Sequence, residues 1–196
     1  MDQEQILRML EPYVRTLREC VRGGWDELRS IPLETRSKFH RCARANVMHS
    51  LTTVRLKVAF VGDNDVRYVE QGLLRVVQVS GGEGAVLLRV KKLDDDLRAS
   101  NVLDSNQLIW DFGEPVQAVV NLGYTVVERG LESYLNEVYL QQEDKNGKLW
   151  DKSIWRTDLE DLNDTGAVSP KDGPTPPAPK VGPRESENEN QEKAGS

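Results

Sequence analysis

The hydrophobic residues of this chain recur at two different spacings, and the change from one to the other comes once, at the turn Gly62–Asp65. Before this turn, apolar residues recur every three or four positions, which is typical of helices. After it they alternate along several short stretches, which is typical of strands. A chain with its helical patterns first and its strand patterns afterwards indicates the α+β class. We therefore expect two N-terminal helices packed on an antiparallel sheet of about five strands.

Two long helices are predicted before the turn. The first covers Asp2–Arg22, is kinked at Pro12 or begins late there, and is ended by Gly23–Gly24, because proline interrupts helical hydrogen bonding and glycine often follows a helix end. The second covers about Glu34–Val58. Its apolar stripe, which is expected to face the core, comprises Phe39, Ala43, Val47, Leu51, Val54 and Val58.

The strands predicted after the turn are joined mostly by short turns. Val66–Glu70 and Leu73–Val79 form a pair, or one strand bent at Gly72, and Ala85–Leu93 returns beside them as a hairpin. Asp144–Gly147 is a strong hairpin turn, because this composition suits the positive backbone angles that tight hairpins need. The remaining strands are expected at Val116–Glu128, Glu137–Gln142 and Lys148–Trp155.

The composition of the chain changes at about Thr157. From there to the end, proline, glycine and polar residues dominate and aromatic residues are absent. Such a segment buries too little apolar surface to offset the entropy that it would lose on ordering. We expect a single α+β domain at residues 1–156 and a disordered tail at residues 157–196. The tail is interpreted either as a linker or recruiting segment, or as an end without a function of its own.

Charge and cysteine content limit the partners and the compartment. A net charge of −6 opposes general coating of nucleic acid, although a local basic patch remains compatible with phosphate binding. The first residues lack a signal-peptide pattern, and no apolar run is long enough to cross a membrane. Cys20 and Cys42 lie far apart in helical patterns and are expected to be buried thiols. The expectation is a cytoplasmic protein without a membrane partner.

The most unusual strand is the one that opens the stretch Gly84–Asn101, because charge accumulates towards its end. Alternation places Arg89 and Lys91 on one side of the strand and Lys92 on the other. The stretch is interpreted either as an exposed strand edge with local ion pairs, or as a patch that binds an acidic partner or a phosphate. The candidate residues are Arg89, Lys91, Lys92, Asp94, Asp95, Asp96, Arg98 and Asn101, with Arg41 and Arg44 from the second helix.

Signatures of catalysis are scarce in this sequence. It has no P-loop, no dinucleotide glycine fingerprint, no GxSxG elbow and no CxxC pair, and no cofactor or metal is expected. The order of helix, hairpin and charged strand is similar to the core of restriction-endonuclease-like nucleases, which hold a divalent metal with an acid and an acid-x-lysine motif. Here the triplet is Arg89-Val90-Lys91, so an arginine replaces the acid. The acids available to a degenerate site of this kind are Asp63, Asp65 and Glu70.

The run LRVKKLDDDLRASN at Leu88–Asn101 resembles a segment of a family of uncharacterised bacterial proteins, in which a strand ends in Phe-Lys-Lys-Leu-Asp-Glu-Asp-Leu-Arg-x-x-Asn. Val90 stands where the family has phenylalanine, and Arg41–Asn46 is similar to a preceding helix of the family. After Asn101 the chain departs, with Val102–Asp104 in place of the usual Tyr-Pro-Thr. The resemblance implies a gene beside a helix-turn-helix or zinc-peptidase protein, in an operon like a toxin–antitoxin or phage-defence module. It implies no catalytic residues.

Two functions follow as hypotheses. The first is a cytoplasmic interaction or regulatory protein, an antitoxin-like partner that binds a protein such as the product of a neighbouring gene. Neutralising a partner needs complementary charge and a buried anchor rather than catalytic chemistry. The alternative is a nucleic-acid-binding or degenerate restriction-endonuclease-like module. In that alternative, the residues expected to contact phosphate are Arg36, Arg41, Arg44, Arg89, Lys91 and Arg98.

Overall fold

The computed structural model describes residues 1–71, 74–82, 84–99, 115–129, 132–144 and 146–158. The chain divides into two units, Met1–Leu159 and Glu160–Ser196, and every described residue belongs to the first. The predicted disordered tail, except for its first two residues, lies outside the described part of the chain. Thr157 still donates its backbone N–H to Asn136 O at 2.8 Å, so the ordered domain reaches just past the predicted boundary.

Helices precede strands, and the α+β class predicted from the sequence is confirmed. The helical elements are α1 (Gln3–Leu10), the 3-10 turn η1 (Glu11–Tyr13), α2 (Val14–Ser30), α3 (Leu33–Arg36) and α4 (Arg41–Ala59). The strands are β1 (Val66–Gln71), β2 (Leu74–Gly81), β3 (Gly84–Lys92), β4 (Val116–Arg129), β5 (Glu132–Asp144) and β6 (Gly147–Arg156). Within the described ranges, none of the helices combines the length and the apolar character needed to cross a membrane.

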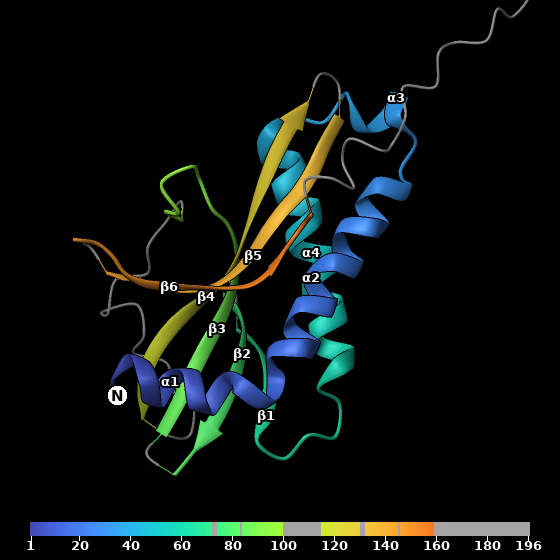
Figure 1. Cartoon of the computed structure of the whole chain (residues 1–196). Helices are drawn as coiled ribbons and strands as arrows, with labels where there is room; N and C mark the ends of the chain where they lie inside the picture. Colours follow the sequence, from blue (N-terminus) through green and yellow to red (C-terminus); the bar gives the residue numbers. More distant parts are fainter. Residues whose placement is uncertain (72–73, 83, 100–114, 130–131, 145, 159–196) are drawn as a thin grey trace, which may run out of the picture. The chain divides into compact units, whose positions relative to one another are not determined.

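The strands lie in the sheet in the same order as in the chain, from β1 to β6 (Figure 1). Neighbours are antiparallel except β3 and β4, which run parallel. The described sheet therefore has six strands rather than about five, and it is mixed rather than wholly antiparallel. A parallel pair needs a crossover far longer than a hairpin turn. That interval is present, because β3 ends at Lys92 and β4 begins only at Val116.

For the first helix, the predicted interruption at Pro12 is confirmed and the predicted end is wrong. Pro12 lies in η1, the 3-10 turn that separates α1 from α2. Gly23 and Gly24 do not end α2, which continues to Ser30. A Cβ added at Gly24 would lie 2.7 Å from Thr52 Oγ1 and 3.1 Å from the backbone N of that residue. The glycine therefore allows α2 and α4 to pack closely, and it does not terminate the helix.

The second predicted helix is divided into α3 and α4, and its predicted apolar stripe is partly wrong. Val54 and Val58, which were expected in the core, are 61% and 69% exposed. The buried residues of α4 are Met48, Thr52, Thr53 and Leu56. Two of these four are threonines, which a pattern based on apolar residues does not count. The buried side of α4 therefore differs from the side that the apolar residues indicate.

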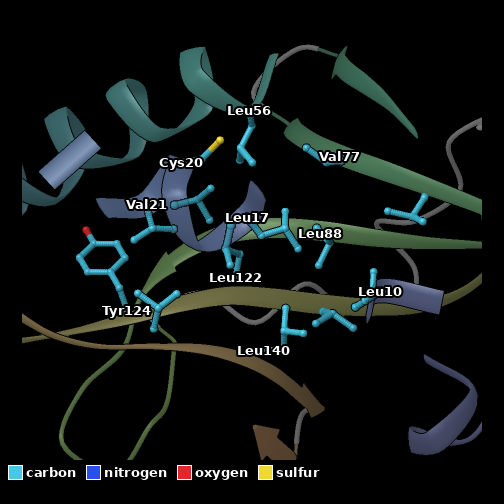
Figure 2. Close-up of a cluster of buried hydrophobic side chains, with 14 of the residues drawn as sticks. Leu10, Leu17, Cys20, Val21, Leu56, Val77, Leu88, Leu122, Tyr124 and Leu140 are labelled. Atoms are coloured by element: carbon cyan, nitrogen blue, oxygen red, sulfur yellow. The ribbon is translucent and has the colours of Figure 1, made fainter. Parts of the chain in front are cut away.

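The main core lies between the helices and one face of the sheet (Figure 1). Side chains two residues apart along a strand share a face, so Val86, Leu88 and Val90 of β3 all belong to this core. In Figure 2, helix residues meet strand residues, and the labelled set includes Leu10, Leu17, Cys20, Val21, Val77, Leu88, Leu122 and Leu140. On the opposite face, Val76 and Leu87 are buried in a second and smaller cluster.

Both cysteines are free thiols. Cys20 is buried in the main core, as predicted. Cys42 is exposed near the start of α4, so the prediction that both thiols are buried is wrong for this residue. Helical periodicity indicates which residues share a face, but it does not indicate which face is covered.

Candidate functional site

The ten candidate residues predicted from the sequence do not form one patch. The predicted alternation along β3 is observed: Val90 lies in the helix-side core, so Arg89 and Lys91 lie on the other face of the sheet. Lys92 lies on the helix side and lines a pocket there with Arg41 and Arg44. Of the acids and arginine after β3, Asp94, Asp95, Asp96 and Arg98 are exposed, and Asn101 lies outside the described residues.

Arg89 belongs to a buried polar network that crosses three strands. It is 6% exposed, and its Nη2 donates to Asn121 Oδ1 of β4 at 2.9 Å. Asn121 Nδ2 in turn donates to Gln141 Oε1 at 2.7 Å and to Glu143 Oε1 at 2.9 Å, both on β5. Burial lowers the pKa of Arg89, and Glu143 opposes this effect. The network therefore joins β3, β4 and β5 inside the sheet. A guanidinium this deeply buried is not available for contact with a partner at the surface.

The same network holds the acidic turn that follows β3. Gln141 Nε2 donates to Leu97 O at 2.7 Å. Within the turn, Asp94 Oδ1 accepts hydrogen bonds from the backbone N of Asp96 at 3.1 Å and of Arg98 at 2.7 Å. Leu97 has a φ of 58°, a conformation that few residues other than glycine adopt. The first of the three consecutive acids therefore stabilises its own turn.

Two of the acids of the nuclease alternative, Asp63 and Glu70, are also engaged locally. Asp63 Oδ1 accepts from the backbone N of Asp65 at 2.9 Å and of Val66 at 3.0 Å, at the start of β1. Glu70 pairs with Arg75 of β2 at 2.9 Å. The strand β2 separates β1, which contains Glu70 and follows Asp63, from the Arg-Val-Lys triplet of β3. In the ranges that the structure describes, no group of three or more His, Cys, Asp or Glu residues is placed to hold a metal ion.

A pocket opens on the helix side of the sheet, and its lining includes Arg36 of α3. Its cavity volume is only about 30 Å³. Its apolar lining consists of Trp25, Leu28, Ala45, Met48, Tyr124 and Val126. Its polar lining consists of Arg29, Arg36, Arg41, Arg44, Lys92, Glu128 and Ser133. The pocket is therefore narrow, with an apolar lining and a strongly basic set of polar groups.

The ends of several elements bring the cations together. Arg36 is the last residue of α3, Arg41 is the first residue of α4, and Arg44 lies in the first turn of α4. Lys92 is the last residue of β3 and pairs in register with Tyr124 of β4. The helix α4 begins without a side-chain cap and without an acid in its first turn. The positive end of its dipole therefore adds to the positive potential of the side chains.

Two of the cations are held in place by hydrogen bonds to their neighbours. Arg44 Nη1 donates to Ser133 Oγ at 3.0 Å, and its Nη2 lies 3.5 Å from Glu128 Oε1. Arg36 Nη1 donates to the backbone O of Arg29 at 3.1 Å. These contacts join the hairpin end of β4 and β5 to α4, and α3 to α2. The walls of the pocket are thus fixed by the same residues that give it charge.

The charges in the pocket do not balance. Five cationic side chains line it but only one acid, Glu128, although Arg29 also lies 4.0 Å from Glu132 outside the lining. Among the described residues, the side chains of Arg41 and Lys92 have no ion pair or hydrogen bond. Burial lowers the pKa of Lys92, the neighbouring arginines lower it further, and Glu128 opposes them. This pattern indicates positive charge crowded in a partly desolvated space, where an anion would be stabilised.

Three of the ten predicted site residues therefore meet in the pocket, namely Arg41, Arg44 and Lys92, and Arg36 of the nucleic-acid alternative joins them. Arg29 and Ser133 are absent from the predicted set. Ser133 lies 89 residues from its hydrogen-bond partner Arg44, and no local pattern connects the two. Only the pairing of β4 with β5 brings it to the pocket.

No protein-family profile, curated protein or solved structure matches this chain at a significant level. Function is therefore inferred from the geometry and charge of the pocket.

Proposed function

We propose that this chain is an interaction protein that binds its partner by accepting a negatively charged group of that partner in the basic pocket. The observation that supports this is the charge imbalance: Arg41 and Lys92, which form no ion pair within 4.0 Å among the described residues, line a pocket whose other lining is largely apolar. The pocket is too narrow for a large ligand but admits a small charged group. Complementary charge of this kind guides association and specificity, and arginine is a frequent anchor at interfaces.

An antitoxin-like regulator in a toxin–antitoxin or phage-defence module is the form of this function that we favour. Such a regulator acts by occupying its target, so it needs a charge complement and an anchoring contact but no reaction. The pocket supplies both for an acidic group on the surface of the target. In this proposal the target is the product of a neighbouring gene.

Nucleic acid is the ligand of the alternative function, and three observations weigh against it. The whole chain carries a net charge of −6, which repels a phosphate backbone. Proteins that follow a strand contact successive phosphates along a groove, whereas this pocket takes one small group. In addition, Arg89 of the predicted phosphate-contacting set is buried. Binding of an oligonucleotide is therefore a result that would contradict a protein partner.

The test is a titration of the full ¹⁵N-labelled chain with a hexaglutamate peptide and, separately, with sodium sulfate. The sequence has four tryptophans, and each gives one indole N–H signal. The variant Trp25→Phe identifies the signal that reports from the pocket lining. We expect this signal to shift to saturation with at least one probe. The shift should weaken as salt is added, because screening reduces attraction between charges that are partly exposed.

Removing the two unpartnered cations should abolish the shift. Arg41→Gln combined with Lys92→Met should leave the thermal midpoint unchanged, because no described ion pair is lost and methionine keeps most of the lysine stem. The control, Arg8→Gln with Arg15→Gln, removes the same charge from exposed positions outside the pocket and should bind normally. Saturable binding that survives loss of Arg41 and Lys92, or a Trp25 signal that responds to neither probe, would refute the proposal.

A further inference from the structure

We propose that the group accepted by the pocket is a phosphate monoester carried by a side chain of the partner protein. This inference rests on the proposed function and specifies the chemistry of the ligand. It is supported by the size of the positive surplus, by the directions from which the donors come, and by the apolar surroundings of the pocket.

The positive surplus is larger than one carboxylate can balance. Five cations line the pocket, and acids lie within 4.0 Å of only two of them. The three that have no acid within 4.0 Å in the described part of the chain are Arg36, Arg41 and Lys92. A carboxylate brings a single negative charge, whereas a phosphate monoester brings about −1.5 to −2 near neutral pH. The phosphate therefore offsets more of the surplus within a similarly small volume.

The available donors come from three different elements. Arg36 ends α3, Arg41 begins α4 and Lys92 ends β3. A phosphate monoester has three terminal oxygens that diverge from one atom, so it can accept hydrogen bonds from donors on several sides. A carboxylate has two oxygens in one plane and satisfies such an arrangement less completely. The uncapped start of α4 contributes further positive potential at the same place.

The surroundings of the pocket favour a protein as the carrier of the phosphate. The apolar part of the pocket lining includes Trp25 and Tyr124. Leu33 lies in the same short helix as Arg36 and is 41% exposed. Apolar surface beside a single anion site suits the residues that flank a phosphorylated side chain. It does not suit the neighbouring phosphates of a nucleic acid, which remain charged and hydrated.

Three small probes distinguish phosphate from other anions: phenyl phosphate, phenyl sulfate and benzoate, each titrated into the full chain and followed at the Trp25 indole signal. Phenyl phosphate loses its second proton at about pH 6, whereas phenyl sulfate carries one negative charge throughout. We therefore expect phenyl phosphate to bind at least about tenfold more tightly than either other probe at about pH 7.5. Its advantage over phenyl sulfate should shrink to less than about threefold at about pH 5. Phenyl sulfate also controls for titration of the pocket itself, whose charged groups are Arg29, Arg36, Arg41, Arg44, Lys92 and Glu128.

The outcomes separate this inference from the proposed function. Equal affinity for all three probes would overturn the phosphate assignment and leave the interaction protein standing, whereas no response to any probe would overturn both. Arg41→Gln with Lys92→Met should lower the affinity for phenyl phosphate at least about tenfold, and the Arg8 and Arg15 control should not change it.

Peptides then test the carrier. A phosphoserine peptide or a phosphotyrosine peptide should bind at least as tightly as phenyl phosphate, and the same peptides without phosphate should not bind at the Trp25 signal. Tighter binding of inorganic phosphate, or of a single-stranded oligonucleotide with or without a terminal phosphate, than of either phosphopeptide would overturn the protein carrier.

Discussion

Replacing Gly24 with alanine should destabilise the fold, although the same change inside an exposed helix normally stabilises it. Alanine is favoured over glycine in a helix interior by about 1 kcal/mol. Here the added Cβ would lie 2.7 Å from Thr52 Oγ1, and 3.1 and 3.3 Å from the backbone N and Cα of that residue. Because backbone atoms cannot rotate aside, α2 and α4 would have to separate. Such overpacking typically costs about 1–3 kcal/mol, so the free energy of unfolding should fall by about 1 kcal/mol in total.

Gly23 is the matched control, because it precedes Gly24 in the same helix. The atoms that an added Cβ would meet there belong to the guanidinium of Arg55, the flexible end of a long side chain. Arg55 Nε donates to Glu27 Oε1 at 2.7 Å, but the two side chains are 41% and 45% exposed. An exposed pair is worth about 0–1 kcal/mol, so Gly23→Ala should be neutral or stabilise the fold by up to about 1 kcal/mol.

Urea and thermal unfolding of the full chain measure both variants. Their free energies of unfolding should differ by about 1.5 kcal/mol, or about 4 °C in thermal midpoint for a folded unit of this size. Adding Thr52→Ala to Gly24→Ala should recover only part of the loss, since it removes Oγ1 but not the backbone. Gly24→Ala should also weaken anion binding, because Trp25 and Met48 line the pocket on either side of this contact. Equal stability of the two alanine variants would refute the reasoning.

Three further predictions concern the buried network and the two thiols. Asn121→Leu should lower the free energy of unfolding by about 3 kcal/mol, because it removes the acceptor of the buried Arg89 guanidinium and the donor to Gln141 Oε1 and Glu143 Oε1. Adding Arg89→Leu to this variant should restore part of the lost free energy of unfolding. A loss below about 0.5 kcal/mol for Asn121→Leu alone, measured by urea unfolding, would contradict the network. Burial raises the pKa of Cys20 from 9.0 to about 11, so the unfolded chain loses this thiol proton at lower pH than the folded chain. The free energy of unfolding should therefore fall between about pH 9 and pH 11, more steeply than in Cys20→Ala, and equal slopes would argue against the shift. In the folded chain at neutral pH, a disulfide reagent should modify the exposed Cys42 and leave Cys20 unmodified.

The features that could be predicted from the sequence depend on near neighbours. The division of Arg89 and Lys91 from Lys92 follows from the alternation of any strand, whatever the sheet around it. The hairpin turn at its predicted place also depends on its own residues. Gly147 has a φ of 134°, and Asp144 Oδ1 accepts its backbone N–H at 3.1 Å. Local physical chemistry is sufficient for both.

The features that could not be predicted depend on residues far away in the chain. Gly23 and Gly24 have the composition of a helix end, but the residue that explains Gly24, Thr52, lies on another helix. Arg89 is indistinguishable in sequence from an exposed strand residue, and only the neighbouring strand shows that it is buried beside Asn121. The pocket likewise needs α3, α4 and the ends of three strands in place at once. A resemblance between short motifs contains none of this information.

The parallel pairing of β3 with β4 makes a seam between two meanders, β1 to β3 and β4 to β6. Strands within each meander follow one another in the chain, so each meander can form through contacts between residues that are close in sequence. The seam instead closes an interval of 23 residues between Lys92 and Val116, which costs more chain entropy and delays the contact. The pocket straddles this seam, because Lys92 is in register with Tyr124 across it and Ser133 belongs to the second meander. Because the proposed ligand would bind only a chain whose two meanders have joined, its binding would stabilise the folded state against their separation.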